Sequence, residues 1–301
     1  MPVAFIGLGN MGGSMSRNLA AAGVDLTVYD TDPARAEAAV AAGAKSADTA
    51  AAAVAGADVL ITMLPTPAIV EDVMLGGGGA LAALPDGALW IDMSTSVPAV
   101  ANRVRERGSA RGIRVLDAPV SGMAKGADAG MLQIFVGGQG ADFAAARPLF
   151  DVLGDPERVL HVGGHGAGYT VKLAINQLWF MQLVSIAEVL TVGVKAGVDL
   201  EVLQKSLIAS PANSVLLERD LEGLLTAGDY DEGFAIALAC KDAGLAVDLA
   251  REVQVPVELG AVTEQIFRRA RAAYGDRAGE MTPVRLYEDI AGIELRKGAA
   301  Q

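Results

Sequence analysis

Residues 3–19 of the chain read VAFIGLGNMGGSMSRNL. This stretch joins a short apolar run, typical of a buried strand, to a helical pattern, and Gly7, Gly9 and Gly12 between them have the spacing G-x-G-x-x-G. In this context the first glycine permits a tight turn, and the second lets the backbone approach a pyrophosphate. The third lets the helix pack on its strand, and the helix N-terminus offers unpaired N–H groups to phosphates. The pattern predicts a dinucleotide-binding domain.

Asp30 indicates which dinucleotide is bound. It ends the second predicted strand, 25–30, and lies eighteen residues beyond Gly12. A carboxylate at this position accepts hydrogen bonds from the adenosine ribose hydroxyls and repels a 2′-phosphate, and Thr31–Pro33 bring no arginine. We therefore expect NAD rather than NADP. The alternative is that Asp30 only caps the following turn.

The first half of the chain alternates short apolar runs with alanine-rich helical patterns. Such an alternation predicts a parallel sheet covered by helices on both faces. Strands are expected at 3–7, 25–30, 58–64, 89–94, 113–120, 131–137 and 158–163, and helices at 11–22, 33–42, 49–55, 67–74, 97–110 and 140–152.

After His165 the pattern changes to long helical periods without a convincing strand. Helices are expected at 167–196, 199–208, 213–226, 231–253, 257–274 and 283–291. The glycine-rich GGHGAG, 163–168, is the natural hinge. We predict an α/β Rossmann domain with a doubly wound, mostly parallel sheet at 1–164, followed by an all-α C-terminal domain at 165–301.

The composition excludes several classes of function. A chain that is 52% hydrophobic and carries a net charge of −12 has a large core and lacks the basic surface that nucleic acid requires. The single cysteine, Cys240, forms no disulfide within the chain, and the N-terminus shows no signal-peptide pattern. The most hydrophobic segment, 173–194, contains Asn176 and Glu188, and these polar residues favour a buried helix over a membrane span. We expect a soluble cytoplasmic protein with no metal, nucleic-acid partner or membrane.

Six sequence blocks together resemble one family, the β-hydroxyacid dehydrogenases, which includes 3-hydroxyisobutyrate dehydrogenase and tartronate semialdehyde reductase. They occur in the order found in that family and span nearly the whole chain. The blocks are FIGLGNMGGSMSRNL (5–19), MLP (63–65), DMST (92–95), DAPVSG (117–122), GAGYTVKLAIN (166–176) and KDAGLA (241–246).

The resemblance implies a helical second domain that shapes the active site and drives assembly into a homodimer or homotetramer. It also implies a small-molecule carboxylate substrate. The residues that it places at the cofactor are Gly7, Gly9, Asn10, Met11, Gly12, Asp30, Leu64, Pro65, Thr95 and Lys241; those that it places at the substrate are Ser121, Gly122, Met123, Thr95 and Lys241. Physically, Thr95 and Ser121 follow predicted parallel strands, and ligands bind at the carboxyl ends of such strands.

Two details modify this assignment. Met123 stands where the family has the second glycine of SGG, and its bulk and restricted φ bear on the choice of substrate more than on the chemistry. Ser96, two residues before Pro98, is expected to cap a helix rather than to touch a ligand.

Lys172 and Asn176 carry the predicted chemistry. Four residues apart on one helix, they share a face. Their apolar surroundings should lower the pKa of Lys172, and oxidation of an alcohol needs a base for the hydroxyl proton. The resemblance assigns that acid–base role to Lys172 and makes Asn176 its partner at the substrate. Taken alone, Lys172 would by default be interpreted as a structural lysine whose ammonium reaches solvent.

Other polar residues are given lesser roles. His161 and His165 are expected to be surface or hinge residues, and Asp242 is expected to hold Lys241 or cap a helix rather than to react.

The predicted activity is reversible NAD-dependent oxidation of a small β-hydroxy acid, with 3-hydroxyisobutyrate as the first candidate, to its semialdehyde or keto acid. An imine reductase is the main alternative, although Lys172, Asn176 and Asp30 count against it. A non-catalytic dinucleotide-binding protein is the other alternative. It would predict a disrupted set of Ser121, Lys172 and Asn176, and the set is intact.

Overall fold

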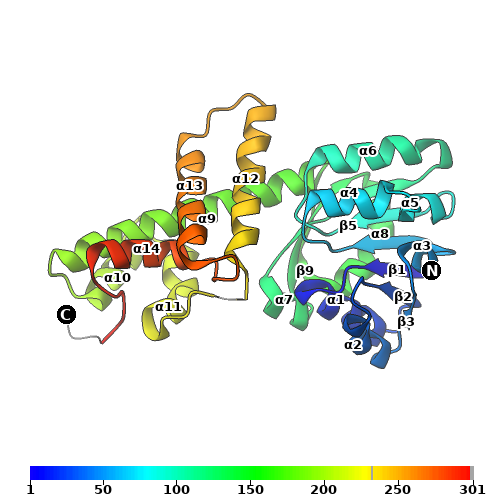
Figure 1. The fold of residues 1–301 in the computed structure, drawn as a ribbon. Helices are drawn as coiled ribbons and strands as arrows, with labels where there is room; N and C mark the ends of the chain where they lie inside the picture. Colours follow the sequence, from blue (N-terminus) through cyan, green and yellow to red (C-terminus); the bar gives the residue numbers. More distant parts are fainter. Residues whose placement is uncertain (232, 299–301) are drawn as a thin grey trace. The chain divides into compact units, whose positions relative to one another are not determined.

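The computed structural model describes residues 1–231 and 233–298, and it divides the chain into two compact units, Met1–Lys172 and Leu173–Gln301 (Figure 1). The division falls inside one long helix. The domain boundary expected from the sequence, 164/165, stays a prediction, and residues 299–301 of the second predicted domain lie outside the described residues.

The first unit is built on a single mostly parallel sheet, as predicted. Its strands are ordered β3-β2-β1-β4-β5-β6-β8-β7, with β9 paired to β8. The pairs from β3 to β6 are all parallel, whereas β8 runs antiparallel to β6 and β7. The strands are β1 (Val3–Ile6), β2 (Leu26–Tyr29), β3 (Lys45–Ser46), β4 (Val59–Thr62), β5 (Leu89–Asp92), β6 (Arg114–Asp117), β7 (Val120–Ser121), β8 (Leu132–Gly138) and β9 (Gly154–Gly163).

Helices cover both faces of this sheet because the strand side chains alternate between two apolar clusters. In β1, Val3 and Phe5 join one cluster, while Ala4 and Ile6 join the other, and all four are buried. The first cluster includes residues of α1 (Asn10–Ala21), the 3₁₀ turn η1 (Pro33–Ala36), α2 (Glu37–Ala41), α7 (Met123–Ala129) and α8 (Gly140–Leu153). The second includes residues of α3 (Ala50–Val54), α4 (Pro67–Leu75), α5 (Ala80–Ala83) and α6 (Pro98–Gly108), which the turn η2 (Ser109–Arg111) follows.

The second unit is helical. Its apolar core includes Phe180, Leu183 and Leu190 from the long helix α9. Within the described residues the only bridge between extended segments joins Ala235 to Gly279. The helices are α9 (Ala167–Lys195), α10 (Leu200–Ile208), the π-helical turn η3 (Leu216–Asp220), α11 (Glu222–Ala227), α12 (Ile236–Glu252), α13 (Glu258–Tyr274) and α14 (Thr282–Ala291). In Figure 1, α12 and α13 lie side by side.

Several expectations about local structure were wrong. The helix expected at 231–253 begins only at Ile236, and Glu232 lies outside the described residues. Ser96 does not cap α6: the N-cap is Val97, without a side-chain hydrogen bond, and Ser96 is fully buried. No helix was expected at α7, where a glycine-rich and alanine-rich stretch gives little apolar periodicity.

Helix α9 is the one described helix that is long and apolar enough to cross a membrane by length and composition. Only 39% of its apolar window is buried. Leu183 and Leu190 nevertheless pack in the core of the helical unit, as expected for a core helix.

Candidate active site

The glycine loop between β1 and α1 is built by close backbone contacts. Gly7 has a φ of +96°, and a Cβ there would lie 2.3 Å from the carbonyl oxygen of Met63. A Cβ on Gly12 would lie 1.9 Å from the carbonyl oxygen of Gly7. Only glycine fits either position, so the loop after β1 is pressed against the loop after β4 and against the start of α1. The N-cap of α1 is Gly9, with no side-chain cap, which leaves the first amides of the helix uncovered by a local side chain.

Asp30 follows β2 and binds this same loop. Its Oδ2 accepts a hydrogen bond of 2.7 Å from the amide of Leu8, and its Oδ1 accepts one of 2.9 Å from the amide of Asp32. The carboxylate therefore caps the following turn, and it also fixes the glycine loop. The two roles considered from the sequence do not exclude each other, because a carboxylate has further lone pairs for a ligand.

Arg35 is a residue near the cofactor loop that the sequence analysis missed. A Cβ on Gly9 would lie 3.4 Å from its Nη1, so the guanidinium lies over the glycine loop. Asp32 lies 3.5 Å from its Nε. Arg35 lies beyond Thr31–Pro33, the residues directly after Asp30 in which an arginine would be expected. The 3₁₀ turn η1 brings Arg35 back toward the loop.

The other predicted site residues of the first unit follow the carboxyl ends of strands. Leu64 and Pro65 follow β4, Thr95 follows β5, and Ser121 ends β7. The registers pair Thr62 with Asp92 and Asp92 with Asp117, so β4, β5 and β6 end level with one another. This edge is where open parallel sheets bind ligands, and β1, between β2 and β4, is the point where the strand order reverses.

Met123 adopts a conformation that favours glycine. Its φ is +55°, and the preceding Gly122 has a φ of +131°. For a side chain with a Cβ this region costs on the order of 1 kcal/mol. The residue is 44% exposed, so Met123 presents an apolar surface at the start of α7, where the β-hydroxyacid dehydrogenase pattern has a glycine.

A buried carboxylate, Asp92, joins several of these strand ends. Its Oδ1 accepts hydrogen bonds from the hydroxyls of Thr62 at 2.7 Å and Ser94 at 2.6 Å. Its Oδ2 accepts one of 2.6 Å from the phenol of Tyr169. Burial raises the pKa of Asp92 despite these hydrogen bonds, and burial also raises the pKa of Tyr169 well above its usual value.

A second buried carboxylate, Asp117, caps the start of α9. Its Oδ1 accepts a 2.7 Å hydrogen bond from the amide of Gly166, and its Oδ2 accepts one of 3.2 Å from the amide of Tyr169. Burial raises the pKa of Asp117 to about 6. Lys172 follows Tyr169 by three residues on α9 and is partly buried.

The remaining predicted residues lie in the second unit. Asn176 donates through Nδ2 to Oδ2 of Asp242 at 2.8 Å, and Lys241 Nζ lies 2.8 Å from Oδ1 of the same carboxylate. Asp242 is only 3% exposed at its side chain. It therefore holds both Lys241 and Asn176, and it leaves the amide oxygen of Asn176 as an acceptor. The expected holding role of Asp242 agrees with this geometry.

His161 is engaged in packing. Its Nε2 lies 2.9 Å from the carbonyl oxygen of Gly138, and its ring stacks on Phe143 with centroids 5.2 Å apart. Burial lowers the pKa of His165. Among the described residues, no three His, Cys, Asp or Glu side chains gather as a metal site.

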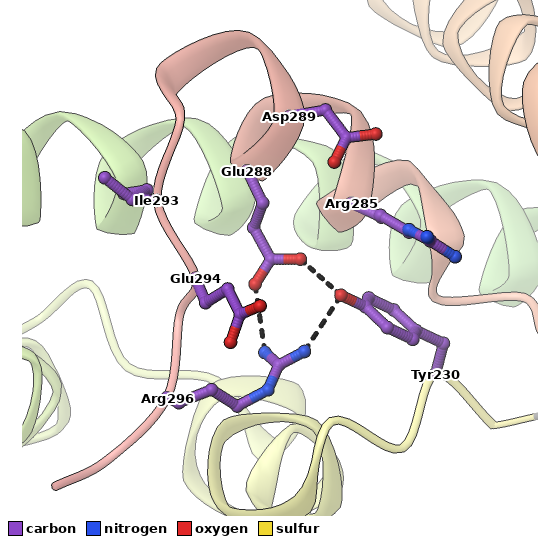
Figure 2. Close-up of a pocket in the computed structure, with 7 residues that line it drawn as sticks. All are labelled: Tyr230, Arg285, Glu288, Asp289, Ile293, Glu294 and Arg296. Atoms are coloured by element: carbon purple, nitrogen blue, oxygen red, sulfur yellow. Dashed lines mark hydrogen bonds and ion pairs between the residues drawn. The ribbon is translucent and has the colours of Figure 1, made fainter. Parts of the chain in front are cut away.

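A hollow of about 320 Å³ in the second unit has a different character. Figure 2 shows the guanidinium of Arg296 placed between Glu288 and Tyr230. It lies 2.9 Å from Glu288 Oε1 and 2.9 Å from the Tyr230 hydroxyl, while Tyr230 also donates to Glu288. The amide of Leu295 donates to Glu288 at 2.7 Å. These groups satisfy one another and tie the segment after α14 to the core, so we assign the cluster a structural role.

Comparison with known proteins agrees with the fold and with the motifs. A family model described as the NAD binding domain of 6-phosphogluconate dehydrogenase matches residues 2–164. A second, described as NAD-binding of NADP-dependent 3-hydroxyisobutyrate dehydrogenase, matches residues 166–287.

Two curated bacterial relatives match nearly the whole chain. The chain is 37% identical over 296 residues to 2-(hydroxymethyl)glutarate dehydrogenase of Eubacterium barkeri, which covers 98% of both chains. It is 38% identical over 283 residues to 3-hydroxyisobutyrate dehydrogenase of Pseudomonas aeruginosa, which covers 92% of this chain and 94% of the relative.

A solved structure is also similar. The 3-hydroxyisobutyrate dehydrogenase of Mycobacterium tuberculosis, solved with L-serine, has a TM-score of 0.86 and 32% identity over 95% of this chain and 98% of that one. The chain therefore belongs to the β-hydroxyacid dehydrogenase family. The names of its relatives and the two matching models support NAD-dependent oxidation of a hydroxy acid, without excluding NADP.

Proposed function

We propose that this enzyme reversibly oxidises a small β-hydroxy acid to its semialdehyde or keto acid, with Lys172 as the general acid–base. The observation that carries the proposal is the anchoring of α9: the helix bearing Lys172 begins directly on Asp117, at the sheet edge where Thr95 follows β5 and Ser121 ends β7. Hydroxy acids of relatives, 3-hydroxyisobutyrate, L-serine and 2-(hydroxymethyl)glutarate, are the first substrates to test.

The glycine loop fits a dinucleotide, because Gly7 and Gly12 leave no room for a side chain and the amides of α1 are uncapped. Gly7, Gly9, Asn10, Met11, Gly12 and Asp30 would hold the cofactor, together with Leu64, Pro65, Thr95 and Lys241. When bound, NAD accepts the hydride that leaves the alcohol carbon.

The chain's own groups do the remaining work. The hydroxyl of Ser121 and the backbone at Gly122 bind the substrate carboxylate, and Met123 adds an apolar wall. Lys172 Nζ takes the hydroxyl proton during oxidation and returns it during reduction. Asn176, whose amide nitrogen is held by Asp242, offers its oxygen to the substrate hydroxyl.

The test is NADH formation by wild type and Lys172→Ala with the three acids and an imine control. Loss of a proton-transfer group is expected to lower kcat by about 100-fold to 10,000-fold. Unchanged turnover in Lys172→Ala would reject the mechanism. Turnover of imines but not of acids would support an imine reductase, and inactivity of the wild type with bound NAD would support a non-catalytic protein.

The same assay with NADP tests the cofactor preference. Asp30 near the ribose position repels a 2′-phosphate, whereas the Arg35 guanidinium over the glycine loop attracts one. We propose that the carboxylate decides and that NAD gives the higher kcat/KM. A higher kcat/KM with NADP would reject this assignment.

We further propose that the protein is a cytoplasmic homodimer or homotetramer. Leu178, Val189 and Val192 are 54%, 47% and 67% exposed on α9, and their spacing places them on one side of the helix. A second copy of the chain would cover these three apolar side chains. Sedimentation of a monomer at micromolar concentration would reject the assembly.

A further inference from the structure

Tyr169 is a buried residue that the proposed chemistry does not use. It is fully buried, and its phenol donates to Asp92 Oδ2 at 2.6 Å. It lies three residues before Lys172 on α9, so the two side chains project from neighbouring positions on one side of the helix. A contact that fixes Tyr169 therefore also fixes the rotation of the turn that carries Lys172.

The partner of Tyr169 is itself held rigidly. Asp92 ends β5 and receives the hydroxyls of Thr62 and Ser94 on its other oxygen. Ser94 Oγ in turn accepts the amide of Leu64 at 2.8 Å. Asp92 thus connects α9 to the ends of β4 and β5, and it stands three residues before Thr95.

A separate contact fixes the distance between the first turn of α9 and the strand ends of the sheet. Asp117 binds the amides of Gly166 and Tyr169, and a Cβ on Gly168 would lie 2.4 Å from the Asp117 carbonyl oxygen. The first turn of α9 therefore rests directly on the strand ends, with no room for adjustment.

We propose that Tyr169, Asp92 and Asp117 are positioning residues for Lys172. Asp117 sets the distance of the first turn of α9 from the strand ends. The hydrogen bond from Tyr169 to Asp92 sets the rotation of that turn about the helix axis. Together they hold the ammonium in line with the hydroxyl whose proton it takes. The proposal rests on the proposed role of Lys172, and it matters because small misplacements of a catalytic group cost large factors in rate.

The test compares Tyr169→Phe with Tyr230→Phe. Each removes one hydroxyl from a buried carboxylate, but Tyr230 lies in the structural cluster of Figure 2. For Tyr169→Phe we expect kcat/KM for the hydroxy acid to fall about tenfold and the KM for NAD to stay within about twofold. We also expect a larger solvent deuterium isotope effect on kcat/KM, because proton transfer becomes slower. Tyr230→Phe should leave all three unchanged.

The outcomes separate this proposal from the proposed function. If Lys172→Ala keeps wild-type turnover, the role of Lys172 fails and the positioning proposal falls with it. If Lys172→Ala is inactive but Tyr169→Phe matches Tyr230→Phe, positioning alone is overturned. A fall in kcat/KM with an unchanged isotope effect also overturns it, because a structural defect would do the same. If Tyr169→Phe does not fold, Asp117→Asn replaces it, with the same expected results.

Discussion

Two hydrogen-bonded pairs of a tyrosine and a buried carboxylate, one in each unit, differ in how the charge of the carboxylate is compensated. Tyr169 and Asp92 lie at the strand ends of the first unit, and Tyr230 and Glu288 lie beneath the segment after α14 in the second. Asp92 receives hydrogen bonds from hydroxyls and from a backbone amide. Glu288 also receives the guanidinium of Arg296.

The two carboxylates differ in whether a cation compensates their charge, and this indicates a different role for each pair. Glu288 has its charge compensated by a partner that is itself 17% exposed, so the second cluster is a stable tie. Asp92 and Asp117 have their pKa values raised because burial outweighs the hydrogen bonds that they receive. Buried carboxylates of this kind cost stability, which natural sequences tolerate mainly where function needs them.

The greatest loss of stability is expected when the cation beside Glu288 is removed. Arg296→Met keeps most of the apolar stem but leaves Glu288, 3% exposed at its side chain, without its cation. Breaking such a buried pair costs about 3–5 kcal/mol in the free energy of unfolding. Urea unfolding followed by circular dichroism measures it.

The activity of Arg296→Met sharpens the contrast, since kcat of the folded variant should equal that of wild type. Arg219→Met, on an exposed pair with Asp220, is the matched control and should cost less than about 1 kcal/mol. Equal losses in the two variants would show that the cluster in Figure 2 is not a tie.

The next effect concerns Asp117 and pH. Its folded pKa of about 6 lies above its ordinary value of 3.8, so the folded state binds the proton more tightly than the unfolded state. The stability that this group contributes is therefore fully present below pH 3.8 and is lost as pH rises through 6. The loss amounts to about 3 kcal/mol at 1.36 kcal/mol per pKa unit.

Asp117→Asn removes this dependence, so its free energy of unfolding should rise relative to wild type between pH 4 and pH 6.5. Urea unfolding of both proteins at these two pH values measures the difference. Asp25→Asn is the control with the opposite sign, because a hydrogen bond from Lys45 lowers the pKa of Asp25. A parallel pH dependence in wild type and Asp117→Asn would contradict the assignment.

Much more of the first unit than of the Glu288 cluster in the second unit could be predicted from the sequence. The apolar runs and the glycine spacing predicted the parallel sheet, because period, length and turn chemistry are local properties. Motif blocks also predicted which strand ends bear the candidate site residues. The sequence did not indicate a role for Tyr169, because its partner Asp92 lies 77 residues away in the chain. It did not indicate a role for Arg35, because only the folded 3₁₀ turn brings this residue back over Gly9.

Nothing in the sequence indicated the hydrogen-bonded cluster of Tyr230, Glu288 and Arg296 in the helical unit. Glu288 and Tyr230 are 58 residues apart and look like ordinary helix and loop residues until the chain is folded. Asp92 and Asp117 at least end apolar strands, and a charged residue directly after a buried run is a signal that could have been followed.

The smallest expected effect comes from removing a neutral hydrogen-bond donor to Asp92. It shows whether such donors stabilise Asp92 as Arg296 stabilises Glu288. Thr62→Val keeps the shape but removes a hydroxyl that donates to Asp92 and accepts from Trp90 Nε1 at 2.9 Å. Two buried partners lose one hydrogen bond each, so we expect a loss of about 2 kcal/mol in the free energy of unfolding. Thr226→Val, whose exposed hydroxyl bonds only the Glu222 carbonyl among the described contacts, should cost less than about 0.5 kcal/mol.

The pH dependence of Thr62→Val decides what the lost donor did. If it stabilised the ionised form of Asp92, its removal raises the pKa of that carboxyl further above its usual value. The folded variant then gains more than wild type from protonation, so the loss measured by urea unfolding should shrink as the pH is lowered through the titration of Asp92. A loss of equal size at every pH at which both proteins fold would assign it to Trp90 instead, and the contrast between a compensated and an uncompensated carboxylate would not extend to the donors around Asp92.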